Sequence, residues 1–273
     1  MTSSPNSLAV YALEIVKEPV PANKVRLARR LGVLWHQGSI RPGKPARNLV
    51  FPDLPGRPDE PELRPLRDMP RRRSGSKKGL IALVHSLVHI ELNAIDMAFD
   101  LLARFAGAPM PLEFFEGALK VGLEEADHFE MINRELEKLG SSYGVLPAHV
   151  GLWDAVMTTR HDLLARLAIV PLVLEARGLD VSPAMIERVK ATGEDSIVQT
   201  MRKIYRDEIT HVAFGAKWFK YLCAQQDRDP VTSFQSLVAE YFRGSLKPPF
   251  NDQARTDAGL PVEFYRPQIS DRS

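Results

Sequence analysis

The sequence has few features of secreted or membrane-bound proteins. Cys223 is the only cysteine among 273 residues, which excludes an internal disulfide and favours a reducing compartment. No stretch approaches the roughly 18 consecutive apolar residues of a transmembrane helix. Residues 1–20 also lack the basic start and apolar run of a secretory signal. We therefore expect a cytoplasmic protein with no membrane partner.

Aromatic residues are scarce at 8%, and the net charge of +2 is small, but the charge is unevenly distributed. Residues 24–78 hold 15 Lys and Arg against 5 Asp and Glu, a balance of +10, whereas residues 79–273 hold 20 against 27, a balance of −7. We expect the basic segment to wrap the acidic part of its own chain. Binding of a phosphate-bearing substrate such as tRNA is the alternative, although no aromatic residues interleave the basic ones.

The chain divides into three parts by composition. Residues 1–76 contain two short amphipathic stretches, 8–16 and 21–35, followed by a proline-rich arm that ends near Arg71, Arg72 and Arg73. Residues 77–226 are predicted to form a helical bundle, and residues 227–273 a C-terminal helix and tail. The helices that periodicity and end signals predict from residue 77 onward are 77–105, 111–138, 155–177, 182–191, 194–225 and 230–242.

Metal-ligand residues recur in a four-part pattern within the predicted bundle. The pattern is Glu91, then Glu125-x-x-His128, then Glu175, then Glu208-x-x-His211. One Glu on each of two helices, with Glu-x-x-His on each of two others, is the ligand arrangement of dimetal-carboxylate four-helix bundles. A single Glu-x-x-His on a helix is more often a solvated surface pair. Here the only two such strings in the chain both belong to the set.

The spacing of these ligands predicts the topology. Glu91 and Glu125 are 34 positions apart, Glu175 and Glu208 are 33 apart, and Glu125 and Glu175 are 50 apart. The two similar steps predict two antiparallel helix pairs, and the longer step predicts a crossover between them. The predicted fold class is therefore all-α: a four-helix bundle with a long crossover, extra N- and C-terminal helices and an extended Pro/Arg-rich N-terminal arm.

Four ionised carboxylates in one apolar interior need compensating charge, because burying each ion costs several kcal/mol. Two divalent cations would balance the four Glu, with the two neutral imidazoles completing the ligand set; otherwise the carboxylates must take up protons. Two iron ions are the expected cofactors. Manganese, or a mixed manganese and iron pair, remains the alternative, because both metals accept Glu and His.

Other residues near the ligands have candidate roles. Glu124 and Asp207 precede His128 and His211 by four residues, so each is expected to accept the second imidazole N–H. Tyr205, one turn before Glu208, is a candidate catalytic residue for redox or proton transfer, against the alternative of a tyrosine at the edge of the core. The remaining histidines do not fit the ligand set and are expected to serve surface or packing roles: His36, His85, His89, His149 and His161.

Several strings resemble a known family. They are Met69-Pro70-Arg71-Arg72, His89-Ile90-Glu91 with Ala94-Ile95-Asp96, and Pro248-Pro249-Phe250-Asn251 with Ala254-Arg255 and Ala258-Gly259. The chain resembles the ferritin-like superfamily and, within it, the bacterial family called Domain of Unknown Function 455. Asp-Glu-x-x-His at 207–211 also resembles the motif of ribonucleotide reductase small subunits and bacterial multicomponent monooxygenases. The resemblance implies a ferritin-like fold and a metal site but assigns no reaction. A more distant similarity to a tRNA hydroxylase suggests tRNA as a substrate.

These observations favour an enzyme, a non-haem di-iron oxygenase or oxidase that activates O₂. Its expected partners are a small-molecule substrate, O₂ and an electron-donor protein, with a homodimer as the candidate assembly. The alternatives are a ferritin-like metal-handling protein, acting as a ferroxidase or peroxide scavenger, and a metal-stabilised binding module. The segment from Lys247 to Pro267 is expected to cover its own bundle, the alternative being a contact with a partner subunit.

Overall fold

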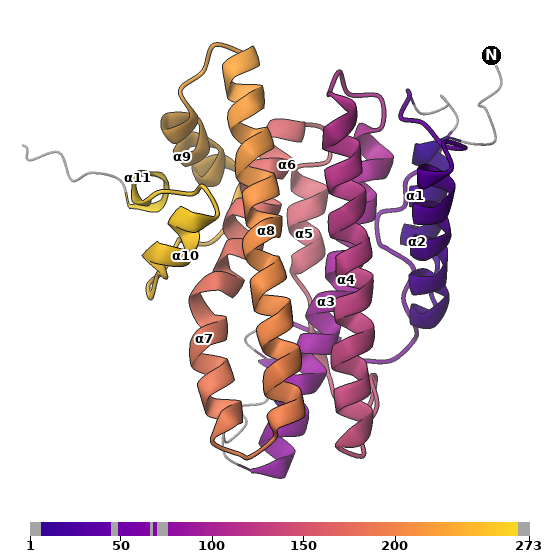
Figure 1. The fold of residues 1–273 in the computed structure, drawn as a ribbon, viewed down its shortest axis with the longest axis vertical. Helices are drawn as coiled ribbons and strands as arrows, with labels where there is room; N and C mark the ends of the chain where they lie inside the picture. The colour runs from indigo at the N-terminus through magenta and orange to yellow at the C-terminus, as the bar shows by residue number, and fades with distance from the viewer. Residues whose placement is uncertain (1–6, 45–48, 66–67, 70–75, 267–273) are drawn as a thin grey trace, which may run out of the picture. The chain divides into compact units, whose positions relative to one another are not determined.

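The computed structural model is all-α and describes residues 7–44, 49–65, 68–69 and 76–266 (Figure 1). By its internal contacts the chain forms two compact units. Unit 1 comprises residues 1–154 and 192–200, and unit 2 comprises residues 155–191 and 201–273. This partition differs from the three parts inferred from composition, which stay a prediction.

Unit 1 is built on a helical hairpin covered by two shorter helices (Figure 1). Its helices are α1 Leu8–Lys17, α2 Pro21–His36, α3 Lys77–Phe105 and α4 Leu112–Lys138. α3 packs along α4, while α1 packs on α3 and α2 packs on α4. Close approach in the hairpin is possible because Gly122 lacks a side chain: a Cβ there would lie 2.9 Å from the Phe99 ring. The predicted helices 8–16, 21–35, 77–105 and 111–138 are thus confirmed to within two residues.

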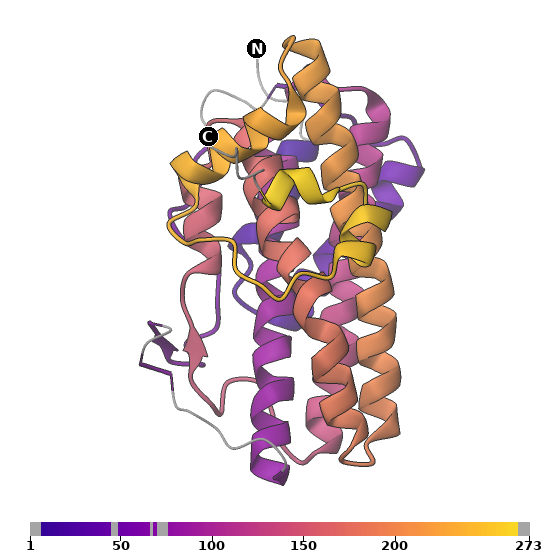
Figure 2. The same cartoon turned by 90° about the vertical axis from the view of Figure 1, so that its left-hand side faces the viewer.

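The arm between α2 and α3 contains no helix over its described residues 39–44 and 49–62. Its strand β1, Leu63–Arg64, pairs in parallel with β2, Ala148–His149, a two-residue contact that the sequence did not predict (Figure 2). The arm is also tied down at Gly56, whose backbone N–H donates to the Val16 carbonyl over 2.8 Å. The basic triplet Arg71, Arg72 and Arg73 lies outside the described residues. The described part of the arm therefore packs on its own unit.

Helix α3 is long and apolar enough to cross a membrane by length and composition alone. However, 72% of its most apolar window is buried in the structure. Its neighbours α1 and α4 cover it. This is the pattern of a helix in the core of a helical protein, and it is weak support for a membrane span.

Unit 2 contains the second set of helices. They are α6 Leu163–Ile169, the π-helix η2 Val170–Glu175, α7 Ala176–Lys190, the part of α8 (Asp195–Gln225) that follows Thr200, α9 Pro230–Tyr241, α10 Asp252–Asp257 and α11 Val262–Tyr265. The short α5, Leu152–Thr158, lies where the chain passes from one unit to the other. The predicted helices 194–225 and 230–242 correspond to α8 and α9.

The two predicted helices 155–177 and 182–191 are wrong in their boundaries. A break after Thr158 separates α5 from α6, and Asp162 caps α6 by accepting the backbone N–H groups of Leu164 and Ala165. The helix then continues through Gly178 and Pro183 to Lys190. A proline inside a helix costs about 3 kcal/mol because it removes a backbone donor. A side chain that is distant in the sequence, that of Asn251, supplies a donor to this turn.

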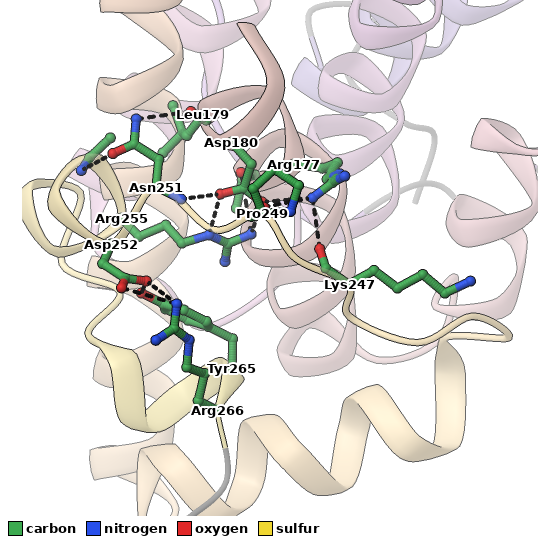
Figure 3. Close-up of polar contacts among 12 residues, drawn as sticks. Arg177, Leu179, Asp180, Lys247, Pro249, Asn251, Asp252, Arg255, Tyr265 and Arg266 are labelled. Carbon is green, nitrogen blue, oxygen red and sulfur yellow. Dashed lines mark hydrogen bonds and ion pairs between the residues drawn. The ribbon is translucent and has the colours of Figure 1, made fainter. Parts of the chain in front are cut away.

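The C-terminal segment packs on its own unit, as expected from the sequence. Arg177 of α7 donates to the carbonyl oxygens of Lys247 and Pro249 over 2.8 and 2.9 Å. Lys220 of α8 donates to the carbonyl oxygen of Gly259 over 2.6 Å. Figure 3 shows the polar contacts around α7 and α10. This segment therefore packs against α7 and α8 of unit 2.

Candidate metal centre

Unit 1 brings three of the six predicted ligands together. His128 Nδ1 lies 3.4 Å from a carboxylate oxygen of Glu125 and 3.7 Å from one of Glu91. One ligand atom from each of the three residues lies within 4.8 Å of the others. Glu125 and His128 come from α4 at a spacing of three, while Glu91 reaches them from α3. The helical hairpin thus converges two carboxylates and one imidazole, as the spacing predicted.

All three side chains are removed from water: Glu91 is 4% exposed, Glu125 1% and His128 0%. Burial raises the pKa of Glu91 to about 7, and the negative charge of Glu125 adds to the shift, although His128 opposes it. Burial lowers the pKa of His128, but Glu125 and Glu91 outweigh this effect and raise it to about 12. In the metal-free chain, protons on these groups therefore reduce the charge of a cluster that would otherwise be strongly anionic.

Unit 2 places the other three predicted ligands on η2 and α8. Glu208 lies one turn before His211, with 3.8 Å between its carboxylate and His211 Nδ1. His211 is fully buried at its side chain and Glu208 is 14% exposed there. Glu175 is the last residue of η2 and is partly buried.

The packing of η2 against α8 in unit 2 determines how Glu175 and His211 are aligned along the two helices. A Cβ on Gly215 of α8 would lie 2.4 Å from the Pro171 side chain of η2. The helix that follows η2 returns into α8 through a short connection after Lys190, so the two segments run antiparallel. Pro171 precedes Glu175 by four residues, and Gly215 follows His211 by four. The close contact therefore brings Glu175 to the level of His211.

The two carboxylates expected to orient the imidazoles both contact lysines. Glu124 lies 3.6 Å from Lys120, and Asp207 forms an ion pair with Lys203. Their side chains are 25% and 16% exposed. Both carboxylates thus combine a buried part with a solvated partner, and their role toward His128 and His211 stays a prediction.

Tyr205 makes a specific contact that sequence reasoning did not anticipate. Its hydroxyl accepts a hydrogen bond of 3.1 Å from the Asn251 side chain. Burial raises the pKa of Tyr205, and the hydrogen bond from Asn251 partly offsets this. The phenol therefore points toward the C-terminal segment, and its proposed redox or proton-transfer role stays a prediction.

Comparison with known proteins places the chain in a family. The family model described as "Protein of unknown function (DUF455)" matches residues 17–266. The chain belongs to the DUF455 family. An uncharacterised protein of Haemophilus influenzae is 36% identical to it over 208 residues, which is 74% of this chain and 72% of the relative. No solved structure matches this DUF455 chain.

A second polar cluster in this DUF455 protein went unrecognised in the sequence. His89 Nδ1 lies 2.8 Å from the Tyr143 hydroxyl, and its Nε2 lies 3.0 Å from the His149 carbonyl oxygen. Asn93 donates to the His89 carbonyl over 2.6 Å and accepts from Arg57 over 2.7 Å. Burial lowers the pKa of His89 to about 4, so its ring is neutral at physiological pH. The cluster connects the arm and the loop after α4 to α3. His89 and Asn93 therefore have a packing role that requires no metal.

The unit 1 residues of this DUF455 protein fit a metal ion by their chemistry and burial. Two carboxylates and one imidazole are the donor types that iron and manganese accept. A positive ion would replace the protons that Glu91 and His128 hold in the metal-free chain. Glu91, Glu125 and His128, which converge within unit 1, supply these donors. The identity of the metal is not determined by the donor set.

Proposed function

We propose that this chain is a dimetal-carboxylate oxidoreductase of the ferritin-like superfamily, acting as an oxygenase or oxidase on an unidentified small molecule. Two iron ions, with manganese or a mixed pair as the alternative, would supply the redox chemistry that activates O₂. The sequence pattern supplies the proposed ligand set: Glu91, Glu125, His128, Glu175, Glu208 and His211. The grouping of all six into one ligand set rests on the sequence, because the Glu residues are 34 positions apart in one half of the pattern and 33 in the other.

The burial of Glu91 and Glu125 against His128 is the observation that carries the proposal. One ligand atom from each of two carboxylates and an imidazole lies within 4.8 Å of the others, and each residue is at most 4% exposed, so the charge of the cluster must be offset by protons or by a metal ion. A purely structural role would be served better by apolar residues of the same size. A divalent ion supplies the compensation and a reason for the cluster.

The protein residues have separable tasks in this function. The ligands would release protons as they bind metal, because raised pKa values let Glu91 and His128 hold protons near neutral pH. Glu124 and Asp207 would hold the two imidazoles in orientation, and Tyr205 would serve redox or proton transfer. The unit 1 ligands are shielded from bulk water, since each is at most 4% exposed.

The test is metal content followed by reaction with air. Full-length protein is loaded anaerobically with Fe²⁺, the iron per chain is counted, and the visible spectrum is followed as air is admitted. We expect about two irons per chain and a transient absorption band. Glu125→Gln and Glu208→Gln should each lower the iron content and abolish the band, whereas Glu116→Gln, at an exposed position of the same α4, should change neither.

Three outcomes would contradict the proposal. Absence of stoichiometric metal would leave the carboxylates as a protonated structural cluster. Stoichiometric metal without any reaction with O₂ would favour a binding role. A shell of 12 or 24 subunits would favour metal storage over an enzyme with one small-molecule substrate.

A further inference from the structure

The carbonyl group of Leu179 lies in a helical turn that contains a proline. In a regular α-helix the carbonyl of residue 179 accepts the backbone N–H of residue 183. Residue 183 is Pro183, which has no N–H, and its ring crowds the same carbonyl. Helix α7 nevertheless runs without a break from Ala176 to Lys190. Some other group must therefore serve the Leu179 carbonyl.

The side chain of Asn251 supplies that donor. Its Nδ2 lies 3.2 Å from the Leu179 oxygen, so the amide donates where the backbone of residue 183 does not (Figure 3). The same Nδ2 donates to the Tyr205 hydroxyl over 3.1 Å. One amide thus bridges α7, four residues beyond the ligand Glu175, to α8, three residues before the ligand Glu208.

Asn251 is itself held rigidly in place. Its backbone N–H donates to Asp180 Oδ1 over 3.0 Å, and its Oδ1 accepts the backbone N–H of Ala254, which caps α10. Both polar atoms of the Asn251 side chain thus form hydrogen bonds, which restrict its rotation. Its geometry is therefore fixed by α7 and α10 together.

A buried ion pair anchors the same segment to α7. Arg255 Nε and Nη2 donate to the two oxygens of Asp180 over 2.8 and 2.7 Å, with both residues almost fully buried. The guanidinium carbon of Arg255 lies 5.1 Å from the Phe250 ring centroid and 4.5 Å from that of Tyr265. Bidentate pairing of this kind fixes direction as well as distance.

We propose that Asn251 is a positioning residue for the metal ligands of unit 2, because it replaces the hydrogen bond lost at Pro183 and ties α7 to α8. The inference rests on the proposed metal site, since its consequence is the alignment of Glu175 with Glu208 and His211. The segment from Lys247 to Tyr265 is then a working part of that site and not a tail.

The first measurement is hydrogen exchange in the full-length chain, which needs no metal. Asn251→Ala should accelerate amide exchange over residues 176–190 about tenfold. Pro183→Ala restores the missing N–H, so the double variant Asn251→Ala/Pro183→Ala should return to the wild-type exchange rate. Gln253→Ala removes an exposed amide from the same α10 and should leave exchange unchanged. If Asn251→Ala accelerates exchange equally in the wild-type and Pro183→Ala backgrounds, Asn251 does not replace the lost hydrogen bond.

The second measurement is anaerobic Fe²⁺ titration of the same variants. Asn251→Ala should weaken Fe²⁺ binding by about 10-fold, at the low end of the range for residues that orient metal ligands. Gln253→Ala should bind as wild type does. Faster exchange with unchanged Fe²⁺ affinity would overturn the positioning role. Wild-type protein that binds no Fe²⁺ would overturn the metal site itself, and in that case the exchange cycle still decides whether Asn251 repairs α7.

Discussion

At the scale of single residues, Lys24 of α2 is a buried cation surrounded by acceptors. Its ammonium group pairs with Asp96 of α3 and also donates to the carbonyl oxygens of Val16 and Gly56, each over 3.3 Å. Both charged side chains are 1% exposed. Burial raises the pKa of Asp96 to about 6, although Lys24 opposes the shift. The pair therefore ties α1, α2 and the arm to α3 at a point where neither charge is solvated.

Lys24→Met should destabilise the protein by about 3–5 kcal/mol near pH 8, because it leaves a buried carboxylate without a counterion. The loss should shrink as the pH falls. Without Lys24 the folded-state pKa of Asp96 lies above about 6, so the protonated group favours folding at low pH and this contribution is lost as the pH rises through that pKa. Urea unfolding at pH 5 and pH 8 measures both effects.

Lys17→Met, at an exposed position of α1, is the matched control and should change stability by less than about 0.5 kcal/mol. An equal loss for Lys24→Met at both pH values would show that Asp96 does not change its protonation state over this range.

At the scale of elements, the contact between η2 and α8 is set by a glycine. A Cβ at Gly215 would lie 2.4 Å from the Cβ and Cγ of Pro171, whereas a Cβ at Gly178 of α7 would meet no atom within 4 Å. Proline cannot retreat easily because its ring is closed onto the backbone. Substitution by alanine should therefore have opposite effects on stability at the two glycines.

Gly215→Ala should destabilise the protein by about 1–3 kcal/mol, because the added methyl group overpacks the contact with Pro171. Gly178→Ala should stabilise it by about 0.4–1 kcal/mol, because it restricts the unfolded chain without a clash. Thermal and urea unfolding measure both. If Gly215→Ala were neutral, the helices could separate at no cost, and the inferred level of Glu175 against His211 would lose its support.

Element boundaries also show where local sequence information ends. Residues 77–105, 111–138 and 194–225 were predicted almost correctly, because apolar periodicity and end signals are local properties. Pro183 was predicted to start a new helix, since a proline normally does so. It lies inside α7 because Asn251 donates to the Leu179 carbonyl. That donor is 72 residues away in the chain, so no local pattern could reveal it.

At the scale of the whole molecule, metal binding should couple to stability. A ligand that binds the folded chain alone at 100 times its dissociation constant stabilises it by about 2.7 kcal/mol. We expect Mn²⁺, which is stable in air, to raise the thermal unfolding midpoint of the wild type. The Glu116→Gln control should show the same rise.

The ligand variants distinguish one shared site from two separate ones. If the ligands of both units hold one pair of metals, Glu125→Gln and Glu208→Gln should each remove most of the Mn²⁺-dependent rise. If each unit binds an ion by itself, each variant should leave about half of it. No rise in the wild type would contradict metal binding. Scanning calorimetry with and without Mn²⁺ makes the comparison.

The sequence by itself determined the all-α class, the positions of the long helices and the ligand candidates Glu91, Glu125 and His128, because helical periodicity places side chains three and four residues apart on one face. Only the tertiary structure decided that the three ligands converge in a buried hairpin, that η2 precedes α7, and that Asn251 and Arg255 join α7 from far along the chain. These features depend on which surfaces pack together. Packing depends on pairs of segments, so it cannot be predicted from the sequence of one segment alone.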